Sequence, residues 1–150
     1  MVKENMSLKD PISLMQGHLG YSNEEMKIFL KDPRIKTTLK QSFALLNKTF
    51  VVEVIKSHGC NSQHKSGDKF YFDGVGNLLT KLNPKKICIY ALSQIERLIF
   101  GAHELFFANQ DPNDMKIKRV GCFDVGLKCG GWGRIIMEIK MIDRKALKKI

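Results

Sequence analysis

A long run with helical periodicity in the middle of the chain constrains the fold more than any other feature. Over about residues 84–108, apolar side chains recur every three or four positions, and charged side chains fall on the opposite face. An amphipathic helix of this length has to bury a broad apolar face against another layer of structure. That apolar face consists of Cys88, Leu92, Ile95, Ile99, Ala102 and Phe106. Asn83 followed by Pro84 predicts the start of the helix, with Asn83 as its cap and proline at the first helical position.

Two pairs of β-branched, apolar runs flank this helix. Residues 49–56 and 69–72 precede it, and residues 116–123 and 134–142 follow it. Paired strands separated by one helix predict an α+β fold, with a four-stranded antiparallel or mixed sheet in ββαββ order. The helix is then expected to cover one face of that sheet.

A short helical pair is predicted ahead of the sheet, after an irregular stretch over residues 1–21. Ser22 and Glu25 have the spacing of a capping box, in which each side chain binds the main chain of the other residue. Asp32 followed by Pro33 predicts the start of a second helix, because proline fits the first helical position.

The length of 150 residues fits one domain. We divide it into a helical extension (residues 1–47), a ββαββ core (residues 48–142) and a basic tail (residues 143–150). No apolar run is long enough to cross a bilayer, and the first residues do not resemble a signal peptide. We therefore expect a cytoplasmic protein whose cysteines are thiols or metal ligands before they are disulfides.

The formal net charge of +10 is spread thinly along the chain. A nucleic-acid surface usually concentrates its charge on one face or helix, so this distribution disfavours nucleic acid as a partner. A basic surface of this kind suits a small anionic ligand or an acidic protein partner. We expect no membrane association.

Four cysteines and nearby histidines are the only chemically distinctive set in the chain. Cys60 and His64 are three residues apart in a predicted loop, and Cys122 and Cys129 lie near a strand end and a glycine-rich segment. Thiolate and imidazole are the ligands that zinc and iron–sulfur clusters prefer. The set therefore predicts a metal site, although the chain has no Cys-x2-Cys pair.

The same residues allow a second interpretation without metal. Cys88 lies in the first turns of the long helix, where N–H groups and the helix dipole favour the thiolate. A thiol enzyme would use Cys60 or Cys88 as its nucleophile, with His64 as the base. A third interpretation for Cys88 is a plain core thiol, because it belongs to the apolar face of the helix.

The segment Gly130-Gly131-Trp132-Gly133 supports a weaker prediction. Its glycine N–H groups are candidates for facing an anionic ligand, with Trp132 as an apolar wall. The alternative is a tight turn that needs positive φ angles. His58 and Asp124 are the candidate acid–base residues beside the cysteine and histidine set. His103, on the long helix, is expected either to lie at the helix surface or to be a core histidine whose hydrogen bonds are satisfied.

These spacings resemble a family of small bacterial and archaeal proteins without an assigned activity. The family pattern joins a Cys…Gly-His-Lys-x-Gly-Asp segment, a mid-chain Cys-Pro-x-Ala and a late Cys-Pro-Asp. In this chain the resemblance covers about residues 50–140. It implies that four residues form the shared set: Cys60, His64, Cys88 and Cys122.

The chain departs from that pattern at three positions. Gln63 replaces the glycine before the histidine, while Ile89 and Phe123 replace the prolines after the second and third cysteines. Ala91 and Asp124 fit the pattern. The resemblance makes Cys129 an accessory residue and implies no activity.

Three functions stay open at this point. The first is a zinc or iron–sulfur protein: four ligands would give a structural or electron-transfer role, and three with an open position would permit catalysis. The second is the metal-free thiol enzyme. The third is an accessory subunit or oligomer that docks a partner through the helical pair and the basic surface.

Overall fold

The computed structural model of the chain describes residues 10–149. They divide into two compact units, residues 10–43 and residues 44–149, and each is described by itself. The boundary falls close to the predicted end of the helical extension. The prediction of one domain stays a prediction. So does the absence of a signal peptide, since residues 1–9 lie outside the described residues.

The first unit is helical. It contains α1 (Pro11–Leu19), α2 (Asn23–Phe29) and most of α3 (Ile35–Leu45). The predicted capping box is confirmed, since the Glu25 N–H donates to Ser22 Oγ at 3.2 Å and the Ser22 N–H donates to Glu25 Oε2 at 2.7 Å. Two hydrogen bonds of this kind satisfy N–H groups that the first helical turn leaves unpaired.

Two predictions for this unit are wrong. Residues 11–19 form a helix rather than an irregular stretch, because Pro11 takes the first helical position and Gly20 ends the helix in the left-handed conformation. α3 begins at Ile35, not at Pro33. Asp32 instead accepts a hydrogen bond from the Arg34 N–H and pairs with its guanidinium, which makes a turn before the helix.

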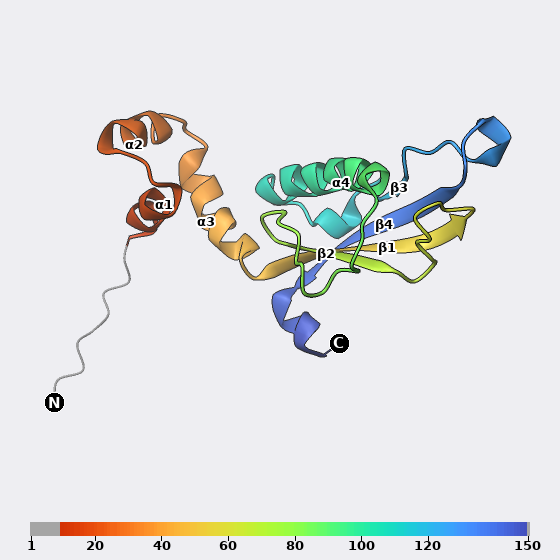
Figure 1. The fold of residues 1–150 in the computed structure, drawn as a ribbon. Helices are drawn as coiled ribbons and strands as arrows, with labels where there is room; N and C mark the ends of the chain where they lie inside the picture. The colour runs from red at the N-terminus through yellow and green to blue at the C-terminus, as the bar shows by residue number, and fades with distance from the viewer. Residues whose placement is uncertain (1–9, 150) are drawn as a thin grey trace. The chain divides into compact units, whose positions relative to one another are not determined.

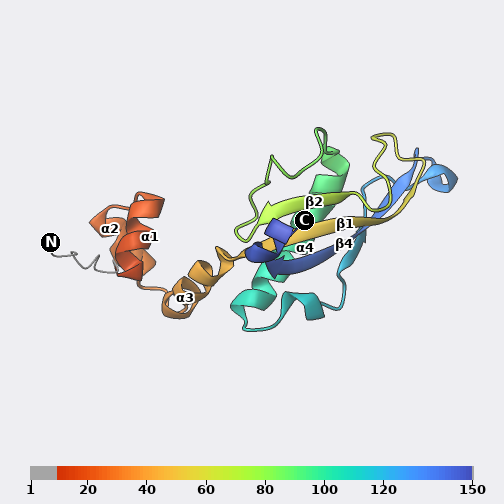
Figure 2. The same cartoon turned by 90° about the horizontal axis from the view of Figure 1, so that it is seen from below.

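The second unit contains a four-stranded antiparallel sheet in the order β2-β1-β4-β3. Figure 2 shows β2, β1 and β4 side by side in that order. The bounds are β1 (Lys48–His58), β2 (Lys69–Asp73), β3 (Arg119–Gly121) and β4 (Arg134–Asp143). β1 and β4 form the centre of the sheet along nearly their whole length, so the predicted α+β fold is confirmed.

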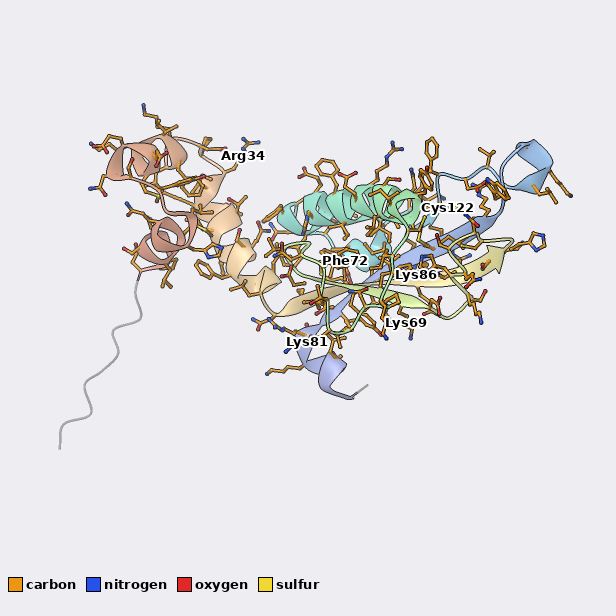
Figure 3. All side chains as sticks on the ribbon, viewed as in Figure 1. Arg34, Lys69, Phe72, Lys81, Lys86 and Cys122 are labelled. Carbon is orange, nitrogen blue, oxygen red and sulfur yellow. The ribbon has the colours of Figure 1, made fainter. Side chains whose placement is uncertain are left out.

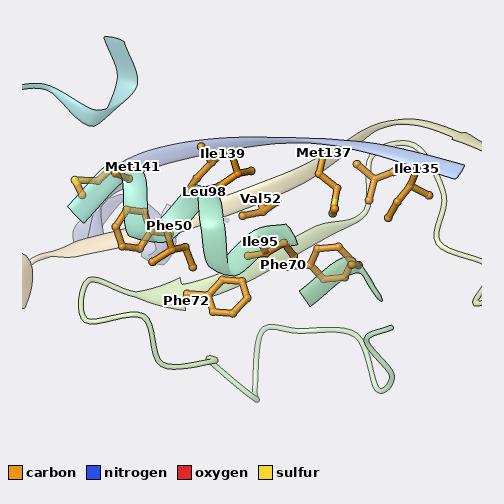
Figure 4. Packing of buried hydrophobic residues seen from close by; sticks show 14 of the residues in the cluster. Phe50, Val52, Phe70, Phe72, Ile95, Leu98, Ile135, Met137, Ile139 and Met141 are labelled. Atoms are coloured by element: carbon orange, nitrogen blue, oxygen red, sulfur yellow. The ribbon is translucent and has the colours of Figure 1, made fainter. Parts of the chain in front are cut away.

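The long helix α4 (Ile89–Phe107) lies along one face of this sheet, as Figure 1 shows. Side chains on the inner face of the sheet alternate along β4, where Ile135, Met137 and Ile139 are buried between exposed or half-buried neighbours. Ile95 of α4 packs into the same cluster and is 1% exposed. Figure 4 shows this layer of apolar side chains between the helix and the strands.

The start of α4 differs from the prediction, because Asn83 does not cap a helix. Its side chain accepts a hydrogen bond from the Tyr71 N–H at 2.9 Å and donates to the Tyr71 carbonyl at 2.7 Å. It therefore fastens the segment after β2 to the edge of that strand. The helix begins five residues beyond Pro84, with Cys88 at the N-cap.

Short 3-10 helices complete the unit: η1 (Pro112–Asp114) and η2 (Leu127–Cys129) lie in connections, and η3 (Arg144–Lys149) follows β4. The third predicted strand, over 116–123, shortens to the three residues of β3, which pair only with β4. Within residues 10–149, none of the helices has the length and hydropathy needed to cross a membrane.

The packing of α4 predicts a large difference between two positions on this helix. Ile95→Ala leaves a cavity in the core and is expected to lower the free energy of unfolding by about 2–5 kcal/mol. Phe100→Ala, at a side chain 62% exposed, is the matched control and is expected to change it by about 0.5 kcal/mol or less. Urea unfolding followed by circular dichroism measures both. Equal effects would contradict the placement of this face against the sheet.

Candidate functional site

A cavity of about 330 Å³ lies where three segments meet in the second unit. These are the loop after β1, the N-terminal end of α4 and the segment between β3 and β4. The four predicted ligands, Cys60, His64, Cys88 and Cys122, all line it. Figure 3 shows Cys122 beside the N-terminal end of α4.

Cys88 is the N-cap residue of α4 and is half-buried. Burial raises the pKa of its thiol, but hydrogen bonding from the Ser62 side chain and the nearby N–H groups of Ala91 and Tyr90 together outweigh burial and hold the pKa below its usual value. The negative charge of Asp124 acts in the opposite direction. Because the sulfur makes no side-chain capping hydrogen bond, the two main-chain N–H groups act mainly as nearby dipoles.

His64 is almost completely buried, with 4% of its surface exposed. Its Nε2 accepts a hydrogen bond of 3.2 Å from the Cys88 N–H, so the ring proton lies on Nδ1, which is 4.0 Å from the Asp68 carboxylate. The ring also packs edge-to-face on Phe70 at 5.1 Å. His64 therefore holds the main chain of Cys88 in place. The lone pair on Nε2 of its imidazole is occupied by this hydrogen bond.

Burial also lowers the pKa of His64 below its usual value of 6.5. The charge of Asp68 opposes this shift, and the charge of Lys86 adds to it. The imidazole is consequently neutral near pH 7. A neutral ring with its lone pair engaged does not match the role of general base that the residue spacing predicted.

Cys60 and Cys122 complete the thiols of the cavity. Both are half-buried and pack against the core cluster between α4 and the sheet. The Cys122 N–H donates to the Ile135 carbonyl at 3.0 Å, and its thiol faces the Asp124 carbonyl at 3.9 Å. These positions keep two further sulfur atoms at the wall of the cavity that Cys88 lines.

Asp124 organises the segment before β4. Its carboxylate accepts hydrogen bonds from the N–H groups of Gly126 at 2.8 Å, Trp132 at 3.1 Å and Gly133 at 3.4 Å. These hydrogen bonds, of which that from Gly126 counts most, hold the pKa of Asp124 below its usual value although burial acts against them. An ionised carboxylate engaged in this way is a poor acid–base residue, in contrast to its predicted role.

The glycine-rich segment does not present its N–H groups to an anionic ligand as predicted. The Gly130 N–H donates to the Leu127 carbonyl, and the Gly131 N–H donates to the Gly126 carbonyl. Trp132 and Gly133 donate to Asp124, as described above. The anionic group that this segment surrounds is therefore the Asp124 carboxylate. The alternative prediction of positive φ holds at Gly130, with φ of 84°.

Three other candidates lie away from the cavity wall. His58 is exposed at the end of β1, and Cys129 is exposed in η2. His103 is half-buried on α4, and its Nε2 lies 2.8 Å from the Gly74 carbonyl, as expected for a satisfied core histidine. Among residues 10–149, no group of three or more His, Cys, Asp or Glu side chains is arranged to hold a metal ion.

Two residues of the site were not predicted from the sequence. Ser62 acts on the Cys88 sulfur from the loop after β1, and no local pattern distinguishes it from the other polar residues there. Tyr90 lines the cavity and is 56% exposed in the first turn of α4. An aromatic residue on the polar side of an amphipathic helix is the signal that points to it.

Comparison with protein-family models, with curated proteins and with solved structures finds no match for this chain. The family resemblance carried by the cysteine and histidine spacing stays a prediction.

The hydrogen bond between His64 and the Cys88 N–H predicts a pH-dependent stability. The unfolded chain protonates this histidine as pH falls below about 6.5, whereas the folded chain resists protonation because its pKa is lowered. The contribution is therefore complete above that pH and is lost as pH falls towards the folded-state pKa. His64→Gln is expected to remove this part of the pH dependence, measured by urea unfolding between pH 5 and pH 8.

His64→Leu tests the hydrogen bond itself. It leaves the Cys88 N–H without its acceptor and is expected to cost about 1–3 kcal/mol at pH 7. His64→Gln retains an acceptor oxygen and serves as the matched control with a smaller cost. An unchanged pH slope in His64→Gln would contradict the neutral, accepting role of His64.

Proposed function

We propose that the cavity is the active site of a thiol-dependent enzyme, with Cys88 as its nucleophile. The observation that carries the proposal is the position of the Cys88 sulfur at the N-terminus of a 19-residue helix, beside the Ser62 hydroxyl, in the wall of a cavity. Helix N-termini and hydrogen-bond donors stabilise a thiolate, which is the reactive form of cysteine.

The surroundings of Cys88 suit chemistry that needs no proton shuttle. His64 directs its lone pair at a main-chain N–H, and Asp124 is held ionised by three N–H groups. A thiolate stabilised by dipoles attacks a soft electrophile directly. Its sulfur supplies the electron pair of the new bond, and either a leaving group departs with its own pair or a conjugated double bond opens and takes a proton from water.

Cys60 and Cys122 are not required as nucleophiles in this mechanism. Like Cys88, both pack against the core cluster, and the Cys122 thiol has the Asp124 carbonyl beside it. Neither lies at the N-terminus of a long helix, the feature that activates Cys88. They therefore provide the matched comparison for the reactivity of Cys88 within one cavity.

The proposal predicts that Cys88 is the thiol alkylated first by iodoacetamide at pH 7, with an apparent pKa below the value of ~8.5 for a free thiol. Ser62→Ala is expected to slow the reaction several-fold, because the thiolate loses a hydrogen bond. Ser66→Ala, at an exposed serine of the same loop outside the cavity wall, is the matched control and is expected to leave the rate unchanged. Peptide mass spectrometry after timed quenching identifies the modified residue at each pH.

Two results would contradict this assignment. One is alkylation of Cys60 or Cys122 ahead of Cys88 in the folded protein. The other is an ordinary thiol pKa for Cys88 that Ser62→Ala does not change. Cys88→Ser should abolish the fast phase and leave the slow modification of the exposed Cys129 intact, which verifies that the assay resolves the cysteines.

A soft metal ion held by the thiols of the cavity is the second candidate function. The observation that favours it is that Cys60, Cys88 and Cys122 all line one small cavity, and thiolates are ligands of zinc and iron–sulfur clusters. His64 is the weakest member of the predicted ligand set, since its Nε2 already accepts the Cys88 N–H. Binding would require the three sulfur atoms to move closer together around the ion.

Anaerobic titration with Co²⁺ tests this second candidate. Binding by three thiolates is expected to give a sulfur-to-cobalt absorption band that saturates at one ion per chain and that zinc displaces. The single variants Cys60→Ser, Cys88→Ser and Cys122→Ser should each weaken it, whereas Cys129→Ser should not. Absence of the band at neutral pH would exclude a three-thiolate site and leave the thiol mechanism unaffected.

A further inference from the structure

We infer that the mouth of the Cys88 cavity binds a planar, uncharged aromatic or conjugated group, so that the substrate carries such a group next to its electrophilic atom. This inference rests on the proposed function of Cys88. Its own basis is a set of exposed aromatic side chains: Tyr90 and Trp132, which line the cavity, and Phe123, which stacks on Tyr90.

Tyr90 and Phe123 form one part of this aromatic mouth. Their rings are stacked, with centroids 5.9 Å apart and planes 25° apart. The Phe123 N–H donates to the Tyr90 carbonyl at 3.3 Å, which ties the segment after β3 to the first turn of α4. Tyr90 is 56% exposed and Phe123 is 68% exposed, although phenylalanine is among the residues most often buried in proteins.

Trp132 forms the other part and is 77% exposed. Its main chain is held in place, because its N–H donates to both carboxylate oxygens of Asp124. The glycines on either side allow close approach: a side chain at Gly131 would collide with Asp124, and one at Gly133 would collide with the main chain of Gly59. The only tryptophan of the chain is thereby fixed beside the cavity, with its ring free.

The charges of the cavity select against an anionic ligand. No lysine or arginine is among the residues that line it. The N–H groups at the start of α4 act on the Cys88 sulfur, and those of residues 130–133 are engaged within the chain. Lys86, which acts on His64, is exposed and is not part of the wall. A ligand with a phosphate or carboxylate would therefore meet two negative groups, the thiolate and Asp124, without a cation in the wall.

The volume fits a single small molecule. Ligand cavities in proteins span roughly 300–1,000 Å³, and the cavity of about 330 Å³ is at the lower limit of that range. A ring placed on Trp132 or Tyr90 at the mouth brings a neighbouring electrophilic carbon towards the sulfur. Each aromatic contact is expected to favour such a ligand by about 2- to 12-fold.

Two maleimides that differ in one substituent test the inference. N-Phenylmaleimide and N-methylmaleimide carry the same electrophile: the Cys88 sulfur forms a bond to one alkene carbon, the double bond opens, and the other carbon takes a proton from water. We expect the ratio of their second-order rate constants at Cys88, divided by the same ratio for N-acetylcysteine, to be well above one.

Variants locate the effect. Trp132→Ala and Tyr90→Ala are each expected to lower this normalised ratio by about 2- to 12-fold. Trp132→Phe retains a ring and should keep most of it, which separates loss of the ring from loss of the fold. Ile117→Ala, at another exposed apolar residue of the same unit (73% exposed), is the matched control and should leave the ratio unchanged.

Three results would overturn the inference. A normalised ratio of one, with Cys88 still reacting fast, would contradict the inferred aromatic substrate group and would leave the proposed role of Cys88 as nucleophile unaffected. Slow reaction of Cys88 with both maleimides would remove the nucleophile as well. Sedimentation velocity that shows a dimer in the wild type and a monomer in Trp132→Ala would make the aromatic mouth a contact between two copies of the chain.

Discussion

The packing of α4 against the inner face of β1 and β4 is the constraint on which the rest of the second unit depends. Ile95 belongs to one buried cluster with side chains of the two central strands, and the alternation along these strands puts their buried side chains on the face that the helix covers. Fixing the helix axis also fixes its first residue. Cys88 is thereby placed next to the loop that leaves β1 and the segment that enters β4.

The polar residues that the sequence suggested as catalytic accept hydrogen bonds from main-chain N–H groups in the fold. The imidazole of His64 accepts the N–H of Cys88, and the carboxylate of Asp124 gathers the N–H groups of the glycine-rich segment. Both interactions satisfy main-chain donors that would otherwise be costly to leave unpaired. They connect the two loops to the start of α4, so that the cavity has walls of defined position.

What these supports hold in place is a cysteine whose thiol pKa is held below its usual value, with the exposed aromatic residues Tyr90 and Trp132 in the same cavity wall. Charge stabilisation at Cys88 comes from fixed dipoles and the Ser62 side chain, so it does not depend on a second titrating group near pH 7. The aromatic residues are exposed, and the main chain of Trp132 and Phe123 is fixed by hydrogen bonds to Asp124 and to the first turn of α4. The proposed reactivity and the proposed selectivity thus rest on separate features of one small region.

Short-range chemistry accounts for the elements that were predicted correctly. The ββαββ order, the capping box at Ser22 and the apolar face of α4 all depend on residues within a few positions of one another. The two wrong helix starts also come from short-range chemistry. Asp32 and Asn83 read as helix caps because cap and turn residues share one local chemistry, and the choice between them was made by hydrogen bonds to Arg34 and to the edge of β2.

The roles of the site residues were decided by contacts that span the chain. His64 and Cys88 are 24 positions apart, and the sequence shows that both are present without showing which atom of the imidazole faces which group. The cavity requires three segments to meet, which follows only from the sheet order β2-β1-β4-β3 and the helix packed on it. Residue spacing thus indicated the side chains of the candidate site, whereas burial and hydrogen bonding in the folded chain separated the proposed nucleophile from the residues that support its main chain.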